Sequence, residues 1–440
     1  MSPSPSSSLL SALSSLPSLP LAPSAFYRDL RAAPLTHDDP LLLPAALLSL
    51  SRDFTISAPP WSVTHTGATL SGHFSYLSAG RAGRGYLVLV GGCLDRLFTQ
   101  SLYLLSSPPA SAPVAFAPGD PVQVIIAGAG QAGLALSARL NRLGVRSTVV
   151  ERGGRVGDNW RERYAGLHLH DPKNAVAMPF QPPPAGLPLL LPKDAVADYL
   201  EDYAERQGAE VLLSASVKSA AYDPAEKRWS VKVEVGGETR ALSAPHFVIA
   251  CGFSGFPHLP AFPGAELFAG RLLHSSAFGA AEAGEKTAVV VGANTSAHDV
   301  AQSLTESGVR VTMVQRSPTT VVSIEAHTRI NMAPFTADLT DDERRDAAIA
   351  GFYSQSYRRI AEEHREHLVP ALKEKDAGLC ERLNAAGFRT DWGEDESGLV
   401  VKFLRRGTGY YMDVGACAMI ADGRVRVVAG EVARMDGGSV

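Results

Sequence analysis

Residues 122–140 read V-Q-V-I-I-A-G-A-G-Q-A-G-L-A-L-S-A-R-L and place Gly128, Gly130 and Gly133 at G-x-G-x-x-G spacing. The apolar run before the glycines predicts a strand, and residues from about 131 to 143 predict a helix. In such a turn the first glycine permits the tight bend, the second lets the backbone approach a pyrophosphate, and the third lets the helix pack on the strand. The helix would aim its free N–H groups and the positive end of its dipole at the phosphates. We therefore predict that a dinucleotide-binding fold begins here.

The segment after this turn favours a flavin as the ligand. The second strand ends at Glu151, 18 residues after Gly133, close to the spacing of about 20 at which a carboxylate binds ribose hydroxyls. Residues 151–171 then hold further glycines, a tryptophan and several arginines. A nicotinamide dehydrogenase does not need such a run here, whereas the long ribityl–isoalloxazine arm of FAD must be walled along its length. The candidate FAD-binding residues are Gly128, Gly130, Gln131, Gly133, Glu151, Arg152, Gly157 and Trp160.

A second glycine turn lies 164 residues further on, in T-A-V-V-V-G-A-N-T-S-A-H-D-V-A at residues 287–301. Asn294 replaces the second glycine, and because asparagine tolerates positive φ better than other residues, we expect the turn to survive with Asn294 in that conformation. The next strand ends at Arg316, at the position where an NAD-binding fold places an acidic residue. A guanidinium there pairs well with a 2′-phosphate, so Arg316 favours NADPH over NADH. A solvated strand-end charge is the alternative for Arg316. The candidate NADPH-binding residues are Gly292, Asn294, Thr295, Ser296 and Arg316.

Two such folds in one chain imply two nucleotides and an enzyme that passes electrons between them. We predict an α/β fold with two Rossmann-like dinucleotide-binding domains, for FAD and NADPH, a helical insertion and a small α+β N-terminal segment. The predicted boundaries are 1–105 for a low-complexity leader and weak α+β segment, 106–121 for a Pro/Ala-rich linker, 122–258 for the FAD-binding domain, and 259–440 for the NADPH-binding domain with its insertion at about 340–387.

Several shorter elements are predicted from local patterns. Residues 192–207 have the apolar spacing of a helix, and Thr340 opens a capping box that predicts another helix start. The run H-F-V-I-A-C-G at residues 246–252 predicts a buried strand, and residues 398–404 and 424–430 predict strands near the end of the chain.

Composition narrows the function classes. With 440 residues and a formal net charge of −4, the chain does not favour a nucleic-acid partner or an anionic membrane surface. No run approaches the roughly 18 apolar residues that span a bilayer, so no membrane span is predicted. The cysteines Cys93, Cys251, Cys380 and Cys417 form no C-x-x-C pair, which argues against a disulfide framework, a metal site and a redox-active dithiol. A reduced, cytoplasmic setting fits this pattern best.

A long spaced motif adds a family resemblance. Phe268, Gly270, His274 and Phe278 match F-x-G-x-x-x-H-x-x-x-F/Y, and A-C-G-F-S-G-F-P-H-L-P at residues 250–260 stands where related proteins cross between domains. From about Val122 onward the sequence resembles the flavin-containing monooxygenases, the class B flavoprotein monooxygenases, and within them the YUCCA-like enzymes and their fungal relatives. The phenylalanine in last place favours this type over Baeyer–Villiger enzymes.

The resemblance implies FAD and NADPH as cofactors, and O2 and a small molecule as substrates. In that class NADPH reduces FAD, O2 forms a C4a-(hydro)peroxyflavin, and one oxygen atom passes to a nitrogen, a sulfur or a carbonyl carbon, as in YUCCA-like oxidation of a keto acid. His170 lies near the place where the class has an isoalloxazine-facing asparagine, so it is the catalytic candidate, with a packed core histidine as the alternative. His274 is expected to contact NADP or to support structure.

Alternatives stay open. Family members continue past the strand at residues 424–430 with a further segment of the FAD domain, whereas this chain stops at Val440, so a truncated, catalytically impaired FAD/NAD(P)-binding remnant is the second hypothesis. A Baeyer–Villiger-type monooxygenase is the third. A flavin disulfide reductase would need a dithiol near the first turn. Residues 24–105 could form an interaction or dimerisation module, which leaves a homo-oligomer open.

Overall fold

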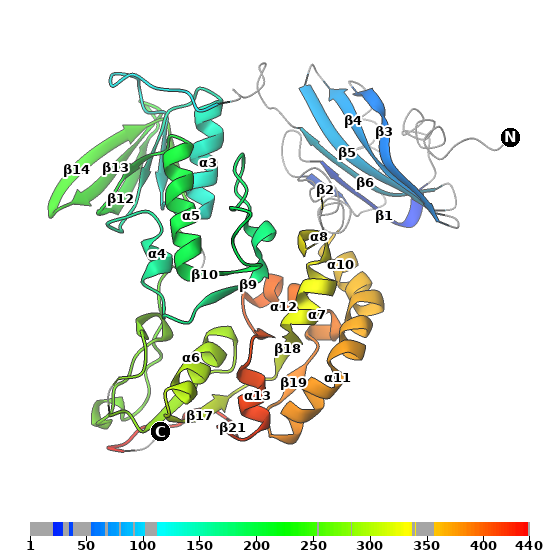
Figure 1. Cartoon of the computed structure of the whole chain (residues 1–440). Helices are drawn as coiled ribbons and strands as arrows, with labels where there is room; N and C mark the ends of the chain where they lie inside the picture. Colours follow the sequence, from blue (N-terminus) through cyan, green and yellow to red (C-terminus); the bar gives the residue numbers. More distant parts are fainter. Residues whose placement is uncertain are drawn as a thin grey trace. The chain divides into compact units, whose positions relative to one another are not determined.

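The chain forms two compact units, which are described separately. The computed structural model describes residues 21–29, 35–37, 54–66, 69–78, 81–90, 93–101, 112–252, 255–282, 284–336, 339 and 356–438 (Figure 1). The first unit comprises residues 1–108 and 337–366, and the second comprises residues 109–336 and 367–440. Among the described residues, no helix combines the length and the apolar character needed to cross a membrane.

The first unit is built on a six-stranded sheet in the order β2-β1-β6-β5-β4-β3. β1 and β6 pair in parallel, and the other neighbours pair antiparallel. The described residues of the N-terminal segment are therefore strand; any helical part of the predicted α+β segment, and the helix predicted to start at Thr340, lie outside the described residues. The elements are β1 (Leu21–Asp29), β2 (Leu35–His37), β3 (Phe54–Thr66), β4 (Thr69–Ser78), β5 (Arg81–Val90), β6 (Cys93–Ser101) and α10 (Tyr357–Glu363).

A four-stranded parallel sheet forms the first Rossmann-like fold of the second unit. Its order is β11-β8-β7-β15, so the chain starts in the interior and adds strands on both sides, which creates a crevice at the carboxyl ends of the strands. Its elements are β7 (Val124–Ala127), α3 (Gln131–Arg142), β8 (Ser147–Val150), α5 (Lys193–Arg206), β11 (Glu210–Leu212) and β15 (His246–Ile249).

One face of this sheet packs against α3 and α5, which lie side by side (Figure 1). α5 confirms the predicted helix, because Val196, Leu200 and Tyr203 recur at helical spacing and are almost fully buried. The other face packs against a three-stranded antiparallel sheet that shares a core with Ile125 and Val150. That sheet consists of β12 (Ala215–Asp223), β13 (Arg228–Val235) and β14 (Glu238–Ala244).

The run at residues 246–252 forms the predicted strand, but the prediction that it is buried was wrong. Among the described residues β15 lies at the edge of the sheet and pairs with β7 alone, and Ile249 keeps 74% of its surface exposed. A continuous apolar run is typical of an interior strand of a parallel sheet, and such a run does not show on which side its neighbours lie.

The second Rossmann-like fold contains two three-stranded parallel sheets, ordered β16-β17-β21 and β19-β18-β20. Their shared core includes Ala301, Met313, Val321, Phe388 and Tyr411, all fully buried. The elements are β16 (Thr287–Val291), α6 (Thr295–Glu306), β17 (Arg310–Gln315), β18 (Thr319–Ser323), α7 (Ile324–Ala326), α8 (Ala333–Thr336), α11 (Val369–Ala385), β19 (Thr390–Asp391), α12 (Gly398–Arg406), β20 (Tyr410–Asp413), α13 (Ala416–Ala421) and β21 (Val425–Ala429).

β21 confirms the strand predicted at residues 424–430, but residues 398–404, also predicted as a strand, form helix α12. A short, mostly apolar run such as this one, with Lys402 in it, has no period that separates a strand from a buried helix. The flanking residues carry the helix signal, because Arg405 and Arg406 occupy the last turn and Gly407 follows at φ 68°, the left-handed conformation that ends helices.

Candidate functional site

The first glycine turn has the geometry of an anion-binding site. The Gly128 N–H donates to the Val150 carbonyl at 2.8 Å, and Gly128 has a φ of +105° that favours glycine. A Cβ on Gly133 would lie only 2.0 Å from the Gly128 carbonyl oxygen, so glycine is needed for helix α3 to pack against the strand. Gly130 caps α3 without a side-chain hydrogen bond, and a Cβ there would meet nothing within 4 Å. The first N–H groups of α3 therefore face an approachable space.

Glu151 holds this turn from the neighbouring strand. Its Oε2 accepts a hydrogen bond from the Ala129 N–H at 2.8 Å, and its Oε1 accepts one from the Gly153 N–H at 2.8 Å. A carboxylate has about four acceptor positions, so two remain for ribose hydroxyls. Ribose binding by Glu151 stays a prediction from the sequence. In the structure the same side chain stabilises the turn through these two hydrogen bonds.

The other candidates for the first site lie on several elements of the same fold. Gln131 is the first residue of α3, and the Arg152 guanidinium lies 5.7 Å from the centre of the Phe256 ring. Gly157, with a φ of +90°, caps the short helix α4 (Asp158–Arg161). Trp160 on α4 is half-buried and packs against the cores of both Rossmann-like folds, so it lies where the two folds meet.

The second glycine turn repeats the geometry of the first, with one correction. The Gly292 N–H donates to the Val314 carbonyl at 3.0 Å, and Gly292 has a φ of +123°. Asn294 was predicted at positive φ but has φ −105° and ψ −174°, much as Gly130 has φ −82° and ψ −175°. The second position of the motif therefore needs a small residue for close approach, and the left-handed region is not required there. The Asn294 Nδ2 donates to the Thr408 Oγ1 at 2.9 Å.

The N-terminus of α6 is also free of side-chain capping. The Thr295 hydroxyl donates to the Tyr410 carbonyl at 3.1 Å, so it is turned toward the protein, whereas Ser296 lines the pocket in front of the turn. As at the first turn, the backbone N–H groups are the anion-binding groups.

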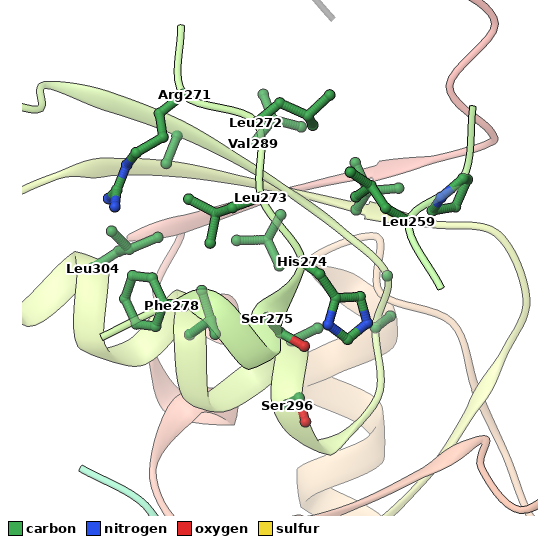
Figure 2. Close-up of a pocket in the computed structure, with 18 of the residues that line it drawn as sticks. Leu259, Arg271, Leu272, Leu273, His274, Ser275, Phe278, Val289, Ser296 and Leu304 are labelled. Carbon is green, nitrogen blue, oxygen red and sulfur yellow. The ribbon is translucent and has the colours of Figure 1, made fainter. Parts of the chain in front are cut away.

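A pocket of about 940 Å³ opens in front of the second turn, and Figure 2 shows its lining. The fingerprint residues Phe268, Gly270, His274 and Phe278 all line it, together with residues 292–296 of the turn. The apolar side chains of Leu273, Phe278 and Leu304 lie on one side, and the polar side chains of His274, Ser275 and Ser296 lie on the other (Figure 2). The motif and the glycine turn, recognised separately in the sequence, thus form one site.

His274 presents a defined donor to this pocket. The Ser276 N–H donates to His274 Nδ1 at 3.1 Å, and the Ser276 hydroxyl lies 2.9 Å from the same atom. Because Nδ1 accepts, the neutral imidazole carries its proton on Nε2. Such an N–H suits a phosphate or carbonyl oxygen, in line with the expected NADP contact.

Arg316 follows β17 and does not line this pocket. Its side chain is 76% exposed, and its Nε lies 3.8 Å from Glu431 Oε1. An ion pair this exposed contributes little to stability, so the guanidinium can turn toward a ligand phosphate without a large cost.

A buried polar cluster joins the two folds at β9 (His168–Pro172), which pairs with β10 (Leu190–Pro192). The Tyr164 hydroxyl donates to Asp299 Oδ2 at 2.6 Å, and Asp299 Oδ1 lies 3.8 Å from His170 Nε2. His170 is only 7% exposed, and among the described residues its Nδ1 has no hydrogen-bond partner. Leaving a buried polar atom without a hydrogen bond costs about 1–3 kcal/mol, so such an atom marks a place where a bound group would supply the missing hydrogen bond.

Burial shifts the acid–base properties of this cluster toward the neutral forms. It lowers the pKa of His170, an effect that the nearby Asp299 carboxylate opposes. It raises the pKa of Asp299, opposed by the hydrogen bond from Tyr164, and it raises the pKa of Tyr164 above its usual range. Strongly perturbed groups gathered in one place are typical of functional sites.

Two further histidines in this region were missed by the sequence analysis. His298 is fully buried and stacks on Tyr411 with ring centres 3.9 Å apart, and burial lowers its pKa to about 4. His327 Nε2 lies 3.0 Å from Asp171 Oδ1, within a π-helical turn over His327–Asn331. The sequence signal was the position of His298 and Asp299 near the start of the helix after Gly292, close to the predicted nucleotide turn.

The comparisons with known proteins agree with this architecture. The family model described as "Pyridine nucleotide-disulphide oxidoreductase" matches residues 125–396, and the chain belongs to that family.

Within the family, the curated relatives that it resembles over about half its length are YUCCA-type monooxygenases, the type that the fingerprint predicted. It is 38% identical over 204 residues to indole-3-pyruvate monooxygenase YUCCA1 of Oryza sativa subsp. japonica, a match that covers 46% of this chain and 49% of that protein. It is 31% identical over 206 residues to probable indole-3-pyruvate monooxygenase YUCCA10 of Arabidopsis thaliana, covering 46% of this chain and 54% of that protein. The chain spans about half the length of these curated relatives.

Among solved structures, the fold is similar to that of cyclohexanone monooxygenase from Rhodococcus sp. Phi1 bound to NADP+, with a TM-score of 0.50 and 18% identity over 71% of this chain and 66% of that one. The OTEMO complex with FAD and NADP gives a TM-score of 0.51 and 16% identity over 70% of this chain and 65% of that one. These likenesses confirm the predicted α/β fold with parallel sheets of the FAD/NADP Rossmann type.

Proposed function

We propose that this chain binds FAD at the first glycine turn and NADPH at the second, and that it uses O2 to oxygenate a small molecule. The observation that carries the proposal is the pair of glycine turns, each followed by a helix of 12 residues whose N-terminus has no side-chain cap. The second of these turns shares a pocket with the family fingerprint. On this proposal residues 122–258 form the FAD-binding domain and residues 259–440 the NADPH-binding domain.

The first turn fits FAD. The open space beside Gly130 and the free N–H groups of α3 suit the pyrophosphate, and the remaining acceptor positions of Glu151 suit the ribose. Gln131, Arg152, Gly157 and Trp160 would continue the site toward the meeting point of the two folds. Bound FAD would supply the electron transfer and the activation of O2, and the chain's own residues would orient it and keep water out.

The second turn fits NADPH. The free N–H groups of α6 and the Ser296 hydroxyl suit the pyrophosphate, the His274 Nε2–H suits an oxygen of the ligand, and the exposed Arg316 suits the 2′-phosphate. The Asn294 side chain is larger than the usual glycine and would make phosphate approach less close than at the first turn.

The names of the curated relatives favour a 2-keto acid related to indole-3-pyruvate as substrate. Oxygenation of a soft nitrogen or sulfur is the second candidate, because the fold is shared by enzymes with different substrates. His170 is the side chain we propose to face the isoalloxazine ring, since its buried Nδ1 is unpaired among the described residues.

The test is a combined measurement of bound FAD and of NADPH oxidation under air in the purified 440-residue chain. We expect stoichiometric FAD and oxidation of NADPH in preference to NADH. In the Arg316→Ala variant the preference for NADPH over NADH should fall at least tenfold, which corresponds to about 1.4 kcal/mol. The control variant Arg426→Ala, which replaces an exposed arginine on β21, should keep the preference of the parent. A folded protein that takes up no FAD would refute the proposal and favour the inactive remnant.

A further inference from the structure

Two carboxylates from different parts of the second unit lie near His170. Asp171 follows it on β9 and meets His327 at 3.0 Å, whereas Asp299 approaches from α6 with its Oδ1 3.8 Å from His170 Nε2. The edge of the Tyr411 ring faces the imidazole, with ring centres 6.0 Å apart. The titratable or charged groups around His170 include Asp171, Asp299, His168, His298, His327 and Tyr411.

The Asp299 carboxylate has an assigned orientation. Its Oδ2 accepts the short hydrogen bond from the Tyr164 hydroxyl, so Oδ1 is the atom left to face His170. The side chain of Asp299 is 11% exposed and that of His170 is 6% exposed, so solvent screens the pair little. The distance of 3.8 Å exceeds that of a hydrogen bond, but such contacts are often long before a ligand binds and shorten afterwards.

A carboxylate next to one imidazole nitrogen selects the tautomer. The proton is favoured on the nitrogen that faces the negative charge, here Nε2, and the other nitrogen then carries a lone pair. In His170 that other nitrogen is Nδ1, the buried atom without a partner among the described residues.

We propose that Tyr164 and Asp299 are positioning residues for His170: together they hold its imidazole with the proton on Nε2, so that Nδ1 offers a lone pair to an N–H or O–H donor of the group bound beside β9. The inference rests on the proposed function insofar as that group is the flavin ring. It assigns roles to two residues that lie 135 positions apart and come from the two different folds.

The Tyr164–Asp299–His170 chain also joins residues of the two Rossmann-like folds. Asp299 lies five residues after Asn294, in the first turns of the helix that would face NADPH, while His170 belongs to the strand that borders the FAD fold. A shift of α6 on nucleotide binding would therefore change the separation of Asp299 and His170, and with it the strength of the tautomer preference.

The first experiment measures the tautomer directly in the flavin-free protein by nitrogen NMR of histidine-labelled chain, with His170→Asn identifying the resonance among the 12 histidines. We expect the parent to carry its proton on Nε2. Asp299→Asn should shift the proton to Nδ1, because an amide can donate to Nε2, and replacing a histidine's orienting carboxylate by an amide selects the wrong tautomer. Asp299→Glu should retain the parent tautomer. A parent protonated on Nδ1, or an unchanged tautomer in Asp299→Asn, would overturn the inference.

The second experiment measures FAD affinity by flavin fluorescence. Asp299→Asn should weaken FAD binding at least tenfold, since the lone pair at Nδ1 is lost. Asp422→Asn, the same change at an exposed aspartate after α13, should leave affinity unchanged, and so should His168→Asn on β9. Equal affinity in Asp299→Asn and Asp422→Asn would count against the role of Nδ1. If the parent binds no FAD, the proposed function fails, and the tautomer comparison alone then decides the positioning role.

Discussion

Replacing the glycines of the first turn one at a time should separate folding from nucleotide binding. A methyl group on Gly133 would start 2.0 Å from the Gly128 carbonyl oxygen, whereas ordinary contact begins near 3.4 Å, so helix and strand must separate by the difference, 1.4 Å. Overpacking of this kind costs about 1–3 kcal/mol, and the better helix propensity of alanine returns up to about 1 kcal/mol. We expect Gly133→Ala to lose about 1–2 kcal/mol, or roughly 2–8 °C in Tm.

Gly130→Ala should behave in the opposite way. The φ of −82° suits alanine, and its Cβ would meet nothing within 4 Å. The loss of about 0.5–1 kcal/mol from a poorer helix cap is offset by about 0.4–1 kcal/mol from a stiffer unfolded chain. Folding should therefore be unchanged within about 0.5 kcal/mol, while FAD affinity should fall at least tenfold because the methyl group occupies the approach to the pyrophosphate.

The assays are circular dichroism melting of the flavin-free proteins and fluorescence titration with FAD. The reasoning would be refuted if Gly130→Ala lowered Tm as much as Gly133→Ala, because the open space at Gly130 would then not exist. It would equally be refuted if Gly130→Ala bound FAD as tightly as the parent.

Three further predictions follow from other parts of the second unit. Lys402 is 5% exposed and donates to both oxygens of Asp391 at 2.8 and 2.9 Å. Because Asp391 is one-third exposed and is left without this partner, Lys402→Met should lower the free energy of unfolding by about 2–3 kcal/mol. A chemical-denaturation midpoint equal to that of the parent would contradict this. The pKa of His298 is about 4 in the folded chain against about 6.5 in the unfolded chain, so stability is lost as the pH falls from 6.5 toward 4, by up to roughly 3 kcal/mol. His298→Gln should flatten this part of the pH–stability curve. An unchanged slope would show that His298 is not its source. Asn294→Gly removes the hydrogen bond to Thr408 and, at this extended backbone position, the side chain that limits the approach of the phosphate. NADPH binding, measured by calorimetry, should therefore tighten severalfold. Weaker binding would show that the Asn294 side chain itself holds the nucleotide.

The parts of the fold that the sequence predicted are those that depend on neighbouring residues. The strand before Gly128, the helix after it and the spacing to Glu151 are short-range patterns, and the structure reproduces them. The fingerprint was also readable, because its residues share one loop, and the structure places it next to Gly292 in a single pocket. Local chemistry is sufficient for such features, since a turn that needs positive φ selects glycine directly.

The errors arose where the outcome depends on distant neighbours. Residues 398–404 and β15 are apolar runs without a clear period, and only the tertiary environment decides whether such a run becomes a helix or an edge strand. Asn294 was predicted at positive φ by analogy with glycine, although the position needs small size alone. The contact of Tyr164 with Asp299 joins residues 135 apart, and no spacing rule finds such a pair in one sequence.

The buried cluster gives a reason why the titratable side chains gather between the two folds and not at the glycine turns. At both turns the anion-binding groups are backbone N–H groups, whose partial charges are fixed and independent of pH. Between the folds, burial lowers the pKa of His170 and His298 and raises the pKa of Asp299, so each group is shifted toward its neutral form. A folded-state pKa above the unfolded value makes the Asp299 contribution to stability favourable at low pH and lost as pH rises through that pKa, opposite in sign to the contribution of His298. In this buried region, where the flavin ring is proposed to lie, solvent screens little, so a single hydrogen-bond donor or acceptor such as His170 Nδ1 has a large effect.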